Sequence, residues 1–189
     1  ELYVYVNQLR DERKAAPRDD IVTKLINAEI EGDRLSDEEF EMFMLLLSVA
    51  GNETTRNATS HGMWGLMSNP DQFDLLKRDL DGKVGNTIDE AVRWGSPVLH
   101  FRRQTTVACQ VGGVDLGDHD KVIMWHASAN RDENVFDDPD AFIIERPNAV
   151  DHVGFGGGGA HYCLGANLAK AELRIIFSEI ATRMPDMTM

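Results

Sequence analysis

The chain has 189 residues and a formal net charge of −13, with 42% hydrophobic and 27% charged residues. This composition is ordinary for a globular protein with its own core, and the negative charge argues against nucleic acid as a partner, because phosphate binding needs a basic surface. Two cysteines are too few for a disulfide framework and favour a reducing, cytoplasmic setting. The longest apolar stretch, residues 42–50, is far shorter than the roughly 20 residues of a membrane span, and Glu1 does not begin a basic signal segment. On these grounds alone, we expect one self-contained domain over residues 1–189.

Two short helices are predicted first. Apolar residues recur every three or four positions from Leu2 to Lys14, which is the spacing of one helix face. Pro17 then breaks this helix, and Asp20 can cap a second helix that ends near Gly32.

A long helix is predicted next. Ser36 and Glu39 have the spacing of a capping box, in which each side chain bonds the backbone N–H of the other residue. The helical pattern then continues to about Met67, and residues 42–51 are apolar almost all round. An apolar surface on every side indicates a buried central helix.

Two shorter helices follow in the predicted order. Pro70 ends the long helix and begins the next, which we expect over residues 71–79. Thr87 and Glu90 belong to a second capping-box pattern, which predicts a short helix that ends at Trp94.

The pattern then changes to strands and loops. Residues 111–114 read Val-Gly-Gly-Val, which predicts a tight hairpin, because primed turns need positive φ. Residues 121–126 predict a third strand. Residues 132–160 are rich in Asp, Pro and Gly with little periodicity, and so long an irregular stretch is typical of a functional segment. A last helix is expected from near Cys163 towards Met184.

A run of four glycines, residues 156–159, precedes this last helix. Each glycine destabilises regular structure by roughly 1 kcal/mol, so the run makes sense where the backbone must approach another group closely. Cys163 follows at the predicted helix N-terminus, where the helix dipole stabilises a thiolate.

Four interpretations of this segment are open from its residues alone. It could be a flexible loop before a buried cysteine, or a phosphate loop, although the required Lys-Ser/Thr pair is missing. It could be a zinc site of His152, His161 and Cys163, although no second cysteine lies at ligand spacing. The fourth interpretation is a thiolate ligand to haem iron.

Two other segments bear on this choice. Gly51, Glu53 and Thr54 interrupt the apolar middle of the long helix. Either the helix emerges to solvent there, or it opens locally so that an acid and an alcohol can relay protons to a ligand. Glu90 and Arg93 share one helix face, although the capping box alone already accounts for Glu90.

Together, in this order and at these separations, the three segments resemble the cytochrome P-450 superfamily. The family pattern is Ala/Gly-Gly-x-Asp/Glu-Thr-Thr, then Glu-x-x-Arg, then a Phe-Gly-rich loop that ends in Cys-x-Gly. The matching segments here are residues 50–55, 90–93 and 155–165. Three connecting stretches match as well, namely residues 96–98, 128–132 and 142–147. The resemblance covers the chain from about Asp19 onward.

The glycine loop departs from the usual family pattern in two ways. Phe155 stands eight residues before Cys163 instead of seven, and His161 replaces the usual arginine two residues before the cysteine. This longer loop looks like that of actinobacterial members that oxidise methyl-branched lipids and sterol side chains.

The resemblance implies a mainly α fold with a small β-sheet. It also implies that residues 1–189 are the C-terminal, haem-binding portion of one larger domain, with the N-terminal half and the final strands absent. The central helix would then expose apolar surface, and we expect the isolated chain to be poorly stable or to oligomerise.

The implied function is haem-thiolate monooxygenation. One oxygen atom of O2 would be inserted into a hydrophobic substrate such as a sterol or branched lipid. Electrons derived from NAD(P)H would reach the protein through a cytoplasmic ferredoxin-type donor and its reductase, and no nucleic acid or membrane span is involved. Two rival functions stay open: a peroxide-using haem peroxygenase, and a truncated non-catalytic fragment or interaction module.

The resemblance also assigns roles to single residues. Cys163 is implied as the proximal thiolate ligand of haem b iron, and Glu53 and Thr54 as the acid and alcohol that deliver protons for O–O cleavage. Further positions would contact the haem: His161, Arg103 (or Arg102 beside it), Phe155, Gly156, Gly157, Gly165 and Gly51. The implied apolar pocket is formed by Ala50, Val98 and Leu99, and the implied structural charge network by Glu90, Arg93 and Arg146. Lys170 and Arg174 are the basic candidates for docking the donor.

Overall fold

The computed structural model describes residues 1–188, and it is mainly helical with three small two-stranded sheets, as predicted. The chain divides into two compact units, a first unit of residues Glu1–Glu53 and a second unit that begins at Thr54. Within residues 1–188, no helix combines the length and the apolar character needed to span a bilayer.

The first unit begins with two helices and a short hairpin. Helix α1 covers Leu2–Ala15, helix α2 covers Ile21–Asn27, and strands β1 (Glu29–Ile30) and β2 (Asp33–Arg34) pair antiparallel. The prediction that the second helix extends to Gly32 is therefore wrong. The helix ends at Asn27 because the backbone of Ala28 is already extended, and Glu31 and Gly32, with positive φ angles of 54° and 91°, form the turn of the hairpin.

The core of the first unit is small. Val6, Val22 and Phe40 are its buried apolar residues. Asp20 caps α2 by accepting a 2.9 Å hydrogen bond from the Thr23 N–H, as predicted.

Helix α3 (Asp37–Ser68) begins with the predicted capping box. The Ser36 N–H donates to Glu39 Oε2 at 2.8 Å, and the Glu39 N–H donates to Ser36 Oγ at 3.2 Å. The helix is continuous, so the local opening suggested for residues 50–55 is not present. Open space surrounds the position where a Gly51 side chain would stand, so no packed group presses on the helix at that point.

The prediction that residues 42–51 are buried is wrong for this chain. None of them is buried, and the exposed fractions of Met42, Leu46 and Val49 are 50%, 60% and 62%. Their apolar character is real, but the first unit covers them only in part, for example where Met44 packs against the core of Val6, Val22 and Phe40. Such an exposed face is what the family resemblance leads us to expect of this helix.

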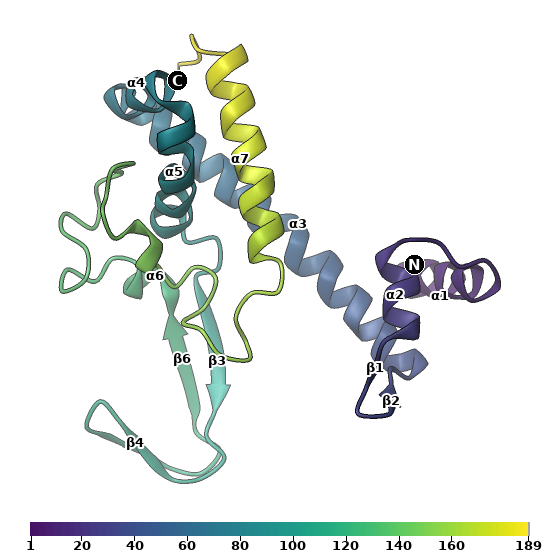
Figure 1. Ribbon diagram of the computed structural model, residues 1–189. Coiled ribbons are helices and arrows are strands. Elements are labelled where there is room, and N and C mark those ends of the chain that lie inside the picture. Colours follow the sequence, from purple (N-terminus) through teal and green to yellow (C-terminus); the bar gives the residue numbers. More distant parts are fainter. Residues whose placement is uncertain (189) are drawn as a thin grey trace. The chain divides into compact units, whose positions relative to one another are not determined.

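The second unit has one continuous core. Helices α4 (Pro70–Arg78), α5 (Leu80–Gly95) and α7 (Ala166–Arg183) pack together, with α5 and α7 side by side in Figure 1. The C-terminal half of α3 contributes to the same core, whose largest fully buried apolar members are Leu66, Leu76, Ile88, Ile144, Leu173 and Phe177.

Helix α5 begins earlier than predicted. Asp79 is its N-cap and accepts a 3.1 Å hydrogen bond from the Gly82 N–H. Thr87 lies inside the helix, where its hydroxyl donates to the Lys83 carbonyl at 2.9 Å. The predicted capping box at Thr87 is therefore wrong, because Glu90 is turned towards tertiary partners rather than to the backbone of its own helix.

Two antiparallel pairs of strands follow α5. Strand β3 (His100–Gln104) pairs with β6 (Lys121–Trp125), as the adjacent arrows in Figure 1 show. Strands β4 (Cys109–Val111) and β5 (Val114–Leu116) form the predicted hairpin, whose two turn glycines have φ angles of 56° and 82°.

Mostly irregular chain connects this sheet to α7. It contains only the short helix α6 (His126–Ala129) and the 3-10 turn η1 (Ala149–Asp151), as expected from the lack of periodicity. Helix α7 begins at Ala166, three residues after the predicted start.

Candidate functional site

The glycine loop folds back on itself before α7. The Cys163 N–H donates to the Phe155 carbonyl at 2.9 Å, and the Tyr162 N–H donates to the Gly159 carbonyl at 3.0 Å. Gly156, Gly158 and Gly159 have φ angles between 77° and 96°, which side-chain-bearing residues rarely adopt. The glycine run is therefore required by the backbone path that places Cys163 beside Phe155.

Cys163 presents a free, exposed thiol. It stands two residues before Gly165, the N-cap of α7, and its carbonyl accepts the Ala166 N–H at 3.2 Å. Its neighbours Tyr162 and Leu164 expose 49% and 79% of their surface. The thiol is thus accessible and flanked by apolar surface, so the interpretation as a buried cysteine is wrong.

The donor groups around this thiol fit haem better than a bare metal ion. Within residues 1–188, no group of three or more His, Cys, Asp or Glu side chains could hold a metal ion. The zinc set is not assembled, because the His152 side chain is buried and directed at Asp89. A lone exposed thiol with apolar neighbours suits an iron whose other ligands come from a flat macrocycle.

Glu90, Arg93 and Arg146 form a buried charge network. Arg93 binds Glu90 through two nitrogens, with Nε–Oε2 and Nη2–Oε1 distances of 2.7 and 2.8 Å. Arg146 Nε lies 3.2 Å from Glu90 Oε2. The side chains of Glu90 and Arg93 are fully buried, and that of Arg146 is 3% exposed. The expected partners are therefore in contact.

This network also holds the irregular chain that precedes the glycine loop. Arg93 Nη1 donates to the carbonyls of Asn130 and Pro139 at 2.8 Å each, and Glu90 Oε1 accepts the Ile143 N–H at 2.8 Å. Arg146 donates to the Asp137 and Asp138 carbonyls. Because α5 supplies Glu90 and Arg93, one helix fixes a segment that has little regular structure of its own.

Asn130 is a functional-site neighbour that sequence reasoning missed as an individual residue. It is fully buried, its Nδ2 donates to Ser96 Oγ at 3.0 Å, and its Oδ1 accepts the Val153 N–H at 2.8 Å. It therefore links the end of α5 to the residues that lead into the glycine loop. Only its place in the matched stretch 128–132 could have drawn attention to it.

A second charged cluster lies where α5, α7 and the start of the loop meet. Lys170 Nζ is 2.6 Å from Asp89 Oδ1, and His152 Nε2 is 3.4 Å from the same oxygen. Burial raises the pKa of Asp89, but the hydrogen bonds and charges of His152 and Lys170 outweigh it and leave this pKa below its usual value. The carboxylate is thus held ionised. From the sequence, His152 was considered only as a zinc candidate and Asp89 was not singled out, because single residues of these types have no periodic signature.

The predicted cations of the haem site lie at the surface of the second unit. His161 is exposed, and Arg103 lies on β3 with its guanidinium 5.8 Å from the Phe101 ring centre. Burial, and then the charge of Arg103, lower the pKa of His126. The exposed side chains of His161 and Arg103 are thus free to approach the negatively charged groups of a ligand.

The predicted pocket and proton-relay residues are divided between the two units. Ala50, Gly51 and Glu53 are exposed in the first unit, and Thr54 is half-buried at the start of the second. In the second unit, Val98 is half-buried and Leu99 exposed. The separate units do not by themselves assemble these six residues.

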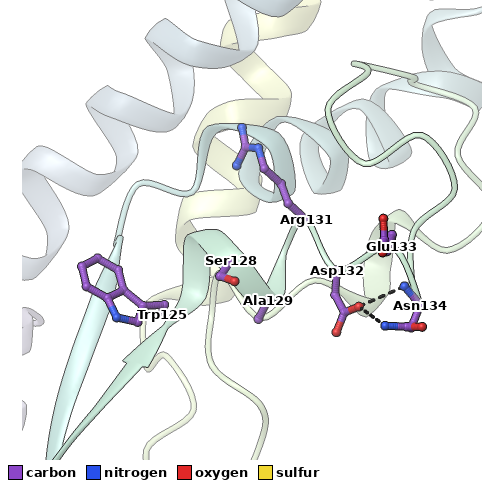
Figure 2. A pocket seen from close by; sticks show the side chains of 7 residues that line it. All are labelled: Trp125, Ser128, Ala129, Arg131, Asp132, Glu133 and Asn134. Atoms are coloured by element: carbon purple, nitrogen blue, oxygen red, sulfur yellow. Dashed lines mark hydrogen bonds between the residues drawn. The ribbon is translucent and has the colours of Figure 1, made fainter.

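One hollow on the surface of the second unit lies beside α6 and has a volume of about 550 Å³. Figure 2 shows the side chains that line it, where Asp132 Oδ1 accepts both the backbone and side-chain N–H of Asn134. This hollow contains none of the predicted site residues. Another hollow, of about 410 Å³, is lined partly by Lys170 and Arg174. Since Lys170 pairs with Asp89, Arg174 is the more available cation of the two.

Comparison with protein families gives a match over almost the whole chain. The family model described as Cytochrome P450 matches residues 2–183. Among curated proteins, the chain is 50% identical to a steroid C26-monooxygenase of Rhodococcus jostii (strain RHA1), over 100% of this chain and 39% of that protein. It is 46% identical to a methyl-branched lipid omega-hydroxylase of Mycobacterium bovis, over 97% of this chain and 42% of that protein.

Solved structures give the same result. A Mycobacterium marinum cytochrome P450 in complex with pseudoionone matches with a TM-score of 0.94 and 43% identity, over 99% of this chain and 45% of that one. The chain therefore spans about two fifths of the length of the curated relatives that it matches.

Proposed function

Because this chain belongs to the cytochrome P450 family, we propose that it is the haem-binding portion of a longer monooxygenase domain, with Cys163 as the thiolate ligand of haem b iron. The observation that carries this proposal is the exposed thiol of Cys163, held beside Phe155 by the 2.9 Å backbone hydrogen bond that closes the glycine loop. When bound, haem supplies the activation of O2 for insertion of one oxygen atom into a substrate.

The loop residues prepare a surface for a flat cofactor. Gly156, Gly157 and Gly165 present no side chains, so the backbone around the thiol leaves room for the macrocycle, and Phe155 packs beside it. His161 and Arg103 would pair with the haem propionates, as cations facing carboxylates, with Arg102 as the alternative to Arg103.

The residues of α3 would serve the other face of the cofactor. In our proposal Glu53 supplies protons, the Thr54 hydroxyl passes them on, and Gly51 leaves room for O2. Ala50, Val98 and Leu99 would form the apolar wall that excludes water and receives the substrate.

The Glu90, Arg93 and Arg146 network would keep the haem-binding segment in place. It binds five backbone carbonyls and one backbone amide between residues 130 and 143, and the same stretch leads to the glycine loop. Its role is structural, because its side chains are buried in the protein interior.

The names of the relatives guide the choice of substrate and partner. We propose a sterol side chain or a methyl-branched lipid as the substrate, since relatives at 50% and 46% identity are named for steroids and methyl-branched lipids. A ferredoxin-type donor, supplied by an NAD(P)H-dependent reductase, would dock near Arg174. Two free cysteines suit a cytoplasmic location.

The test of this function is the carbon monoxide difference spectrum of the reduced, haem-loaded protein. The wild type should show the absorption band of a thiolate-ligated haem, and Cys163→Ser should abolish it. Cys109→Ser is the matched control, because Cys109 is also free and exposed but lies in the β4–β5 hairpin. Loss of the band in both variants, or in neither, would reject Cys163 as the ligand.

A further inference from the structure

The function proposed above makes no use of the cluster formed by Asp89, His152 and Lys170. These residues come from α5, the end of η1 and α7, so three separate elements meet at one buried point. The side chains of His152 and Asp89 are 3% and 14% exposed. Taking a carboxylate and an imidazole largely out of water is costly unless their polar atoms find partners.

One hydrogen bond at Nδ1 and one polar contact at Nε2 define the tautomer and orientation of His152. Its Nδ1 accepts the Gly154 N–H at 2.9 Å, so the ring proton lies on Nε2, which is 3.4 Å from Asp89 Oδ1. Asp89 is in turn fixed by Lys170 Nζ at 2.6 Å. The carboxylate thus directs the acceptor nitrogen of His152 at Gly154, which directly precedes Phe155 and the glycine loop.

Close packing leaves this part of the loop little freedom. A side chain added at Gly154 would place its Cβ 2.4 Å from Val92 Cγ1 and 3.1 Å from His152 Nδ1. The ring of Phe155 is 5.5 Å from that of His152, and Lys170 Nζ lies 5.6 Å from the same phenyl ring. The Phe155 carbonyl then accepts the Cys163 N–H. A contiguous set of contacts therefore runs from Asp89 through His152 to Cys163.

We propose that His152 is a positioning residue for the Cys163 thiolate, and that Asp89 and Lys170 hold its imidazole in the orientation that binds the Gly154 N–H. The proposal rests on the proposed function, since the property that it positions is the bond between Cys163 and iron. Loss of a residue that orients a metal ligand typically weakens metal binding by about 10- to 100-fold.

The experiment compares His152→Leu with His152→Asn in the haem-loaded protein. Leucine removes the acceptor, whereas an asparagine side-chain oxygen can still accept the Gly154 N–H. We expect haem release to an excess of a haem-free acceptor globin to be about tenfold faster for His152→Leu, with most of that loss restored in His152→Asn. Asp89→Asn should have an intermediate effect, because it keeps an acceptor for His152 Nε2 but loses the charge that binds Lys170.

Leu76→Ala serves as the control for general destabilisation, because Leu76 is fully buried in α4 and has no part in the loop contacts. Equal haem release from His152→Leu and Leu76→Ala variants of equal stability, or no rescue by asparagine, overturns the proposal. If His152→Leu does not fold, the rates of haem release from wild type, His152→Asn and Asp89→Asn are compared instead. Faster release from Asp89→Asn than from wild type supports the proposal, and equal release from all three overturns it. A wild type without the thiolate carbon monoxide band would instead show that the proposed function itself has failed.

Discussion

The two halves of α3 carry similar apolar residues but differ in what surrounds them. In the first half, Met42, Leu46 and Val49 are at least half exposed, whereas Met63 and Leu66 in the second half are buried beneath α5 and α7. The same helix thus contains both an uncovered and a covered apolar face. Whether an apolar side chain is buried depends on the elements that pack against it. An apolar sequence pattern predicts that such elements are needed but does not show that they are present.

The two units also differ in where their ion pairs lie. In the first unit, ion pairs such as Arg13 with Asp20 lie at or near the surface. In the second unit, Glu90 binds two arginines in the interior. A surface pair contributes little free energy, whereas breaking a buried pair leaves an uncompensated charge. The free energy of unfolding of the second unit should therefore depend much more strongly on single charged residues.

The largest effect is expected from Glu90→Gln. It leaves Arg93 and Arg146 without their carboxylate partner, which should lower the free energy of unfolding by about 3–5 kcal/mol. Urea unfolding followed by tryptophan fluorescence measures this change, since Trp64, Trp94 and Trp125 all lie in the second unit. The control Glu179→Gln breaks an exposed pair with Arg183 and should cost about 0.5 kcal/mol or less. Equal losses of unfolding free energy in both variants would show that buried and exposed ion pairs do not differ in this protein.

A matched pair of leucines on α3 tests the contrast in burial. Leu66→Ala removes a fully buried side chain and should cost about 2–5 kcal/mol, because it leaves a cavity in the second unit. Leu46→Ala removes a side chain that is 60% exposed, and its effect should stay within about 0.5 kcal/mol. Circular dichroism during urea unfolding follows both variants. A large loss for Leu46→Ala would show that the first half of α3 is covered in solution, for example by a second copy of the chain.

The smallest change in stability is expected when the pH is lowered, and it concerns the first unit. The hydrogen bond from Arg13, followed by that from the Thr23 N–H, lowers the pKa of Asp20 from 3.8 to about 2. Because this pKa is lower in the folded chain, the stability that it contributes is complete above pH 3.8 and is lost as the pH falls through about 2. Hydrogen exchange of the α1 and α2 amides should therefore accelerate over this window in the wild type. Asp20→Asn should reduce this pH dependence of hydrogen exchange. Asp19→Asn, the neighbouring surface control, should leave it unchanged.

Much of the fold could be predicted where a local pattern decides the structure. The capping box of Ser36 and Glu39 and the hairpin around Gly112 and Gly113 depend on residues within a few positions of each other, and both predictions are confirmed. The start of α5 was missed because Glu90 satisfied a local pattern but binds Arg93 and Arg146 instead. A tertiary partner more than 50 positions away cannot be read from a capping motif.

In the candidate site too, residues in local sequence patterns could be predicted, whereas residues defined by distant contacts could not. Family motifs pointed to Cys163 and to Glu90 with its arginines, because those residues stand in recognisable local patterns. His152 was considered only for zinc, and Asn130 only as part of the matched stretch 128–132; the roles of both follow from the contacts that they make with α5 and the loop. The exposure of residues 42–51 could not be derived either, since it depends on which other elements are present.

Helix α5 carries Asp89 and Glu90 at consecutive positions, and they serve two different clusters. Each added residue turns a helix by about 100°, since one turn takes about 3.6 residues. Inserting or deleting one residue between Leu80 and Asp89 would thus turn both carboxylates away from their partners at once. The β4–β5 turn has open space around both of its glycines and could accept extra residues. Tolerance to changes in chain length should therefore be lowest in α5, although it is one of the most regular segments of the protein.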